Sequence, residues 1–158
     1  MRKEKLSIIS CIAILLLFLS VSLTSCMSSE DPVPVPTVNK SVFTITNATV
    51  PDTLYMKDHA DFVISKLRLH NKADGKVMCE LDHKKYETEL KDGNTVLGQV
   101  TYENGEFSKV TIDNWCELIK SRDKNNKKVY IMKPIGNRTD LYMYLGVFTQ
   151  SGITVTVK

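Results

Sequence analysis

The chain has few residues of the kinds that build metal sites or nucleic-acid surfaces. Its 158 residues include only four cysteines and three histidines. None of them is spaced as Cys-x-x-Cys or as two histidines four positions apart, the patterns typical of zinc sites. The formal net charge is only +3, whereas a nucleic-acid binder shows a basic excess clustered on one face. We therefore expect no metal, no cofactor and no DNA or RNA partner.

The N-terminal apolar run is too short for a membrane-spanning helix. It extends from Leu6 to Val21 behind a short basic stretch, whereas a spanning helix needs about 20 apolar residues. Because the run ends in small polar residues, it predicts a signal peptide over residues 1–25, with an uncleaved anchor helix as the alternative. The first five residues carry a net +2, which leaves +1 on the remainder.

The apolar run ends in the sequence Leu23-Thr24-Ser25-Cys26. This order of residues resembles the bacterial lipobox, in which the cysteine receives a diacylglycerol and the peptide is cut before it. The resemblance implies that Cys26 is lipidated, with acyl chains such as palmitate, and that the mature chain is held on a membrane. Each buried methylene contributes about 0.8 kcal/mol, so several acyl chains anchor a protein stably.

Residues 26–40 combine an acidic stretch with alternating prolines, and they predict a tether between the lipid and the folded domain. Ser28–Asp31 resembles the acidic export signal of Bacteroidetes lipoproteins that are displayed on the outer face of the outer membrane. Met27, directly after Cys26, is unlike an inner-membrane retention signal. The resemblance implies an outer-membrane location with outward display, and an ordinary solvated spacer is the alternative.

From residue 41 onward, short β-prone runs alternate with turn residues. This texture predicts one all-β domain over 41–158, an antiparallel sandwich or small barrel of about eight strands with one short helix. The clearest element is a hairpin of Thr95–Tyr102 and Phe107–Ile112, because Asn-Gly between them suits the two positive φ values of a type I′ turn. Further strands are expected at 42–46, 77–82, 86–90, 129–132, 141–148 and 153–157.

Three segments of this domain have patterns that differ from simple alternation. The strand at 141–148 is bulky on both faces, which predicts a central position, and Gly146 allows a bulge. Residues 57–70 carry both helical and alternating spacing, and the alternation favours a strand from about Phe62. Asn114 and Glu117 resemble a capping box, so we expect a short helix over Asp113–Lys120 with Trp115 buried.

Cys79 and Cys116 remain once Cys11 leaves with the signal peptide and Cys26 carries the lipid. An exported compartment permits a disulfide between them, and two free buried thiols are the alternative. A catalytic thiol paired with His83 is a third reading, but a reactive thiolate needs an electropositive pocket rather than an apolar strand.

Other candidate residues have weaker patterns. Asp52-Thr53-Leu54 resembles the site at which Bacteroidetes O-glycosylate exported proteins, which makes Thr53 a candidate for modification; an unmodified turn is the alternative. Exposed tyrosines suit contact with sugar rings. The remaining candidates are the histidines His59, His70 and His83, the tyrosines Tyr130, Tyr142 and Tyr144, and the basic runs at 57–70 and 120–128.

Taken together, the lipobox, the acidic and proline-rich tether and the β-rich body resemble the small lipoproteins of Bacteroidetes with calycin-like or immunoglobulin-like domains. We predict no catalytic residues, and we expect a non-enzymatic binding or accessory module of the outer membrane. Its partners would be the membrane, through the lipid, and another envelope protein or a surface glycan. The alternative is a calycin-like carrier of a small apolar ligand, and an envelope hydrolase has little support.

Overall fold

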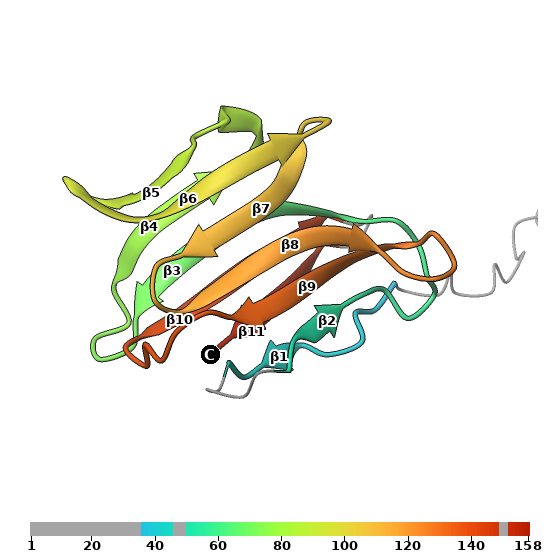
Figure 1. Cartoon of the computed structure of the whole chain (residues 1–158), viewed down its shortest axis with the longest axis horizontal. Helices are drawn as coiled ribbons and strands as arrows, with labels where there is room; N and C mark the ends of the chain where they lie inside the picture. Colours follow the sequence, from blue (N-terminus) through green and yellow to red (C-terminus); the bar gives the residue numbers. More distant parts are fainter. Residues whose placement is uncertain (1–35, 46–49, 149–151) are drawn as a thin grey trace, which may run out of the picture. The chain divides into compact units, whose positions relative to one another are not determined.

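The chain forms a β-sandwich of two sheets in the computed structural model, which describes residues 36–45, 50–148 and 152–158. Figure 1 shows the second sheet lying across the first. The predicted all-β class is confirmed, and of the two architectures considered the sandwich is formed. The described residues form no closed barrel.

The first sheet has the order β1 (Val42–Phe43), β11 (Ile153–Val157), β10 (Leu141–Phe148), β3 (Val63–Asn71) and β4 (Val77–Asp82). The second sheet has the order β2 (Asp52–Leu54), β9 (Lys128–Pro134), β8 (Cys116–Arg122), β7 (Glu106–Ile112), β6 (Thr95–Glu103) and β5 (Glu89–Asp92). The first sheet is antiparallel except for the parallel pair β1–β11, and the second sheet is antiparallel throughout its described strands. A single 3₁₀ turn, η1 (His83–Lys85), lies in the connection from β4 to β5.

The core forms where the apolar faces of the two sheets meet. Successive side chains of a strand point to opposite faces, so every second residue reaches the core. In β10 the buried residues are Leu141, Met143, Leu145 and Val147, each followed by a less buried neighbour. Trp115 and Tyr130 are among the largest fully buried side chains. The predicted burial of Trp115 is confirmed.

The strongest sequence signals are found as expected. Asn104 and Gly105 have φ values of 52° and 77°, which fit the predicted turn between β6 and β7. Strand β10 is central in its sheet, and its register shifts between Gly146 and Val147. Strand β3 begins at Val63, so the strand interpretation of that segment is confirmed.

The short helix predicted over Asp113–Lys120 is wrong. Ile112 pairs with Cys116, and the intervening residues form a tight turn in which the Trp115 amide donates to the carbonyl oxygen of Ile112 at 3.1 Å. Asn114 has a φ of 55°, a conformation that asparagine tolerates in turns. Leu118 and Ile119, which with Trp115 suggested a helical face, belong to β8, which lies between β7 and β9.

The folded domain begins earlier than residue 41. Val38 is buried in the core and forms a β-bridge with Met56, although the sequence placed it in the tether. The amide of Asn39 donates to the carbonyl oxygen of Tyr55 at 2.9 Å. Strand β2, which the sequence did not predict, follows this segment, and β5 lies at Glu89–Asp92 rather than 86–90.

The predicted signal peptide and the lipobox cysteine Cys26 lie outside the described residues, as does the end of the strand expected at 42–46. Among the residues described, no helix has the length and apolar character needed to cross a bilayer.

Because β6 pairs closely with β7, replacing Gly98 by a residue with a side chain should destabilise the fold. A Cβ atom there would overlap the Thr111 carbonyl oxygen and lie 3.1 Å from the Ile112 Cα. We expect Gly98→Ala to lower the free energy of unfolding by about 1–3 kcal/mol, measured by urea denaturation. In the control Gly146→Ala the nearest atoms lie at 3.4 Å, so its loss should be smaller. Equal losses for the two variants would contradict this account.

Candidate functional site

The core-facing side of the second sheet changes from apolar to charged at one end. Leu118 in β8 is buried, and Lys120 follows two positions later on the same face. In β9, Met132 and Tyr130 are buried, and Lys128 continues their face in the same way. The register pairs Lys120 with Tyr130, so the charged positions adjoin the core directly.

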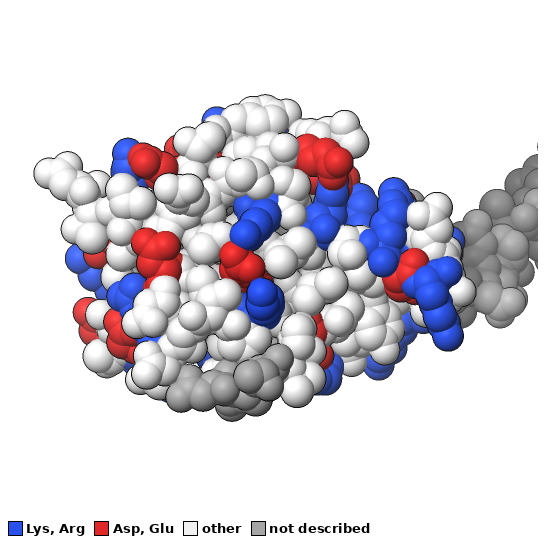
Figure 2. Space-filling model, in the orientation of Figure 1, with Lys and Arg blue, Asp and Glu red and all other residues white. Residues whose placement is uncertain are grey.

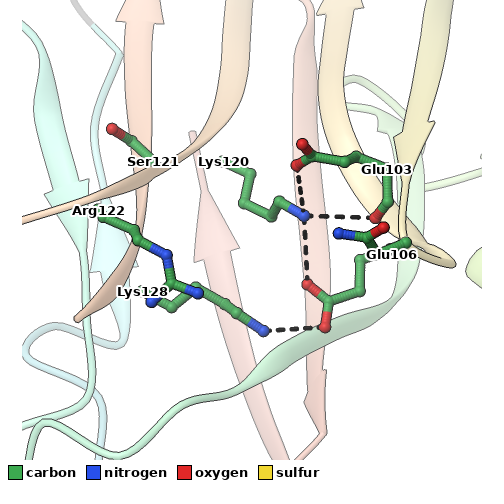
Figure 3. A pocket seen from close by; sticks show the side chains of 7 residues that line it. Glu103, Glu106, Lys120, Ser121, Arg122 and Lys128 are labelled. Carbon is green, nitrogen blue, oxygen red and sulfur yellow. Dashed lines mark hydrogen bonds and ion pairs between the residues drawn. The ribbon is translucent and has the colours of Figure 1, made fainter. Parts of the chain in front are cut away.

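Two glutamates from the neighbouring hairpin meet these lysines (Figure 3). The Lys120 Nζ lies 2.9 Å from Glu103 Oε2 and 3.6 Å from Glu106 Oε2. The Lys128 Nζ lies 2.8 Å from Glu106 Oε1. The lysine side chains are only 14% and 12% exposed. Partly buried charges are costly without a partner, so Glu106 stabilises both lysines at once.

The ion pairs border a hollow of about 400 Å³, which we call the charged hollow. Arg122 adds a third cation, and its Nη1 donates to the carbonyl oxygen of Asn126 at 2.7 Å. Within the described part of the chain Arg122 forms no salt bridge, so its other donors are open to a ligand. The residues that line the charged hollow are Glu103, Asn104, Glu106, Lys120, Ser121, Arg122 and Lys128.

The electrostatics favour an anionic ligand. The hydrogen bond and the positive charge of Lys120 lower the pKa of Glu103, so this carboxylate stays ionised at neutral pH. Burial, with a smaller contribution from the Glu106 carboxylate, raises the pKa of Tyr130, which stays neutral. Three cations then face two carboxylates, which leaves an excess positive charge. Figure 2 shows basic side chains gathered toward the end of this face, near the β8–β9 loop.

The three histidines occupy separate surroundings. His70 in β3 stacks on Tyr142 at 4.7 Å, and its buried Nε2 has no hydrogen-bond partner among the described residues. The Nδ1 of His83 lies 3.0 Å from the carbonyl oxygen of Ser65. His59 is exposed on the loop after β2. In the described ranges no group of three His, Cys, Asp or Glu residues is placed to hold a metal ion.

The other aromatic and basic candidates also have defined places. Tyr142 and Tyr144 lie on the outward face of β10, whereas Tyr130 is fully buried and its hydroxyl donates to Phe107 O at 3.3 Å. Of the first basic run, Arg68 pairs with Glu80 at 2.6 Å. The second run contributes Lys120, Arg122 and Lys128 to the charged hollow. The sequence did not identify this site, because it predicted a helix where β8 forms.

Cys79 and Cys116 are free, buried thiols in the structure, which does not form the predicted disulfide between them. Cys79 lies in β4 and Cys116 begins β8, so the two belong to different sheets. Burial raises the pKa of Cys79 to about 11 and that of Cys116 to about 12. Both therefore remain protonated at neutral pH, whereas a reactive cysteine needs a low pKa.

Thr53 lies in the edge strand β2 and is half-buried. Its backbone amide donates to the side chain of Asp52 at 2.8 Å, and its carbonyl oxygen accepts from the side chain of Asn39 at 2.8 Å. These contacts place Thr53 in a pleated strand rather than in the turn that the sequence suggested. Its O-glycosylation stays a prediction.

Comparison of the chain with protein-family models, with curated proteins and with solved structures finds no match.

The raised thiol pKa values predict slow alkylation of the folded chain. Iodoacetamide at pH 8 should label Cys79 and Cys116 rapidly only after denaturation without reductant, as measured by peptide mass analysis. Both pKa values exceed the ordinary 9.0 in the folded state. Above pH about 9 the unfolded chain loses these protons while the folded chain keeps them. The contribution of the two thiols to the free energy of unfolding should therefore be constant from neutral pH to about pH 9 and fall as the pH rises further. Thiols that stay unlabelled after denaturation would indicate a disulfide.

Proposed function

We propose that this chain is a lipid-anchored lipoprotein of the outer membrane, held through Cys26, whose sandwich acts as a non-enzymatic binding or accessory module of the cell envelope. The charged hollow would be its contact site, and it would take an anionic group of an envelope partner. The observation that carries this proposal is the placement of Lys120, Lys128 and Arg122 around one hollow next to the rigid core.

The geometry supports binding because the hollow is organised before any ligand arrives. Glu106 holds Lys120 and Lys128 in fixed positions, and both lysines start from strands whose next inward residues are buried. A prearranged site loses little side-chain entropy when it binds. Arg122, which has donors available, suits a carboxylate or phosphate because its planar guanidinium can form two parallel hydrogen bonds.

The proposed location depends on the sequence before the sandwich. Leu23, Thr24 and Ser25 precede Cys26 as in a lipobox, and the acidic and proline-rich tether would separate the domain from the lipid surface. The charge that remains after residue 25 is only +1. General attraction to an anionic membrane surface is therefore weak, and the lipid would supply the attachment.

The anchor is tested by Cys26→Ala in a bacterial host that processes lipoproteins. We expect the variant to lose its acyl mass, to keep residues 1–25 because the cut follows lipidation, and to leave the outer-membrane fraction, as measured by fractionation and intact-mass spectrometry. Cys79→Ala is the matched control and should stay in the membrane, because Cys79 is a buried thiol in β4. A Cys26→Ala chain that remains in the outer membrane would refute the anchor.

The contact site is tested with a soluble form made without residues 1–25 and with Cys26→Ala. We expect it to bind saturably to outer-membrane vesicles from cells that lack the protein, and Lys128→Glu to weaken this binding at least tenfold by reversing a charge in the hollow. Lys133→Glu changes an exposed lysine of the same strand and should bind normally. Equal binding by the Lys128 and Lys133 variants would exclude the charged hollow as the contact.

A further inference from the structure

A second hollow, of about 410 Å³, lies against the opposite face of the same sheet end. Val129 and Ile131 of β9 form its floor, on the face that points away from Tyr130. Thr53 and Tyr55 border it from the segment at β2. We call it the aromatic hollow, and its remaining lining residues are His59, Arg122 and Asp123.

Two aromatic rings in a parallel, stacked arrangement line this hollow. The rings of Tyr55 and His59 are parallel within 8°, with centroids 6.4 Å apart. Tyr55 is 38% exposed. Its backbone is nevertheless held in place, because its amide donates to Asn39 Oδ1 at 3.0 Å. His59 has a φ of 56°, and its amide donates to the carbonyl oxygen of the buried Met56 at 2.9 Å. The backbone of both residues is therefore held by hydrogen bonds to neighbouring segments of the folded domain.

The rim of the aromatic hollow carries charged groups in fixed positions. Asp123 Oδ1 accepts from the amides of Asn125 and Lys127, each at 2.8 Å. The hydrogen bond from Lys127 is the main reason that the pKa of Asp123 is lowered. Asp123 therefore stays ionised, and its second oxygen is left as an acceptor. Arg122, fixed by its bond to Asn126, lines this hollow as well as the charged hollow.

We propose that the aromatic hollow binds a pyranose ring of an acidic carbohydrate. The C–H face of the sugar would stack on the exposed ring of Tyr55, which His59 supports by stacking on it. The sugar hydroxyls would donate to Asp123, and its carboxylate would pair with Arg122. An exposed ring face next to an ionised acceptor and a guanidinium matches the mixed apolar and polar surface of a uronic acid. This inference goes beyond the proposed function, because it assigns a second site and names the class of its ligand.

The test is saturation-transfer NMR on the full chain purified in detergent, with methyl β-glucuronide and methyl β-glucoside as probes. We expect transfer to the ring protons of the glucuronide and roughly tenfold weaker binding of the neutral glucoside, which lacks the charged hydrogen bond to Arg122. Tyr55→Ala should abolish the transfer, whereas Tyr55→Phe keeps the ring and should retain it. Arg122→Gln should make the two glycosides bind equally.

Tyr86→Ala is the matched control, since Tyr86 is 57% exposed but lies against Tyr102 in another part of the sandwich. It should leave glucuronide binding unchanged. Transfer to neither glycoside, or transfer that survives Tyr55→Ala, would overturn the proposal. The vesicle experiment depends on Lys128 and this experiment on Tyr55, which line different hollows. A failure of the charged hollow can therefore be told apart from a failure of this site.

Discussion

Both hollows depend on the packing of the two sheets against each other. This packing decides which alternate side chains of each strand point toward the core and which point away from it. Along β9 this packing places Tyr130 and Met132 in the core and directs Val129 and Ile131 to the opposite face, where Val129 is also buried. At the end of the strand the same alternation directs Lys128 to the core-facing side. The hydrophobic core therefore determines where the charges meet as well as the stability of the domain.

On the core-facing side of β8 and β9, charged residues directly follow buried apolar ones. The fold tolerates these charges because each lysine there forms an ion pair with a glutamate. Leu118 is buried, and Lys120, two residues later, is within salt-bridge distance of both glutamates of the β6–β7 hairpin. An unpaired lysine at this depth would destabilise the fold. Glu106, which contacts two lysines from different strands, also holds the ends of β7, β8 and β9 in register.

The errors in the sequence-based prediction share one cause, which is that pairing between strands overrides local preference. Asn114 and Glu117 have the spacing of a capping box, yet pairing of Ile112 with Cys116 makes the segment a turn followed by a strand. The β6–β7 hairpin was predictable because its turn residues and its alternation agree. Val38 looked like part of the tether because its partner Met56 lies far along the chain.

The sequence by itself determined the all-β class, the β6–β7 hairpin and the central position of β10, because turn chemistry and side-chain alternation are local properties. The lipobox reading of Cys26 is likewise local, and it lies outside the described residues. Only the tertiary structure placed Glu106 between Lys120 and Lys128, and Tyr55 and Arg122 around the same hollow. These residues come from different strands and loops, and their neighbours are set by strand order and register, which no local pattern encodes.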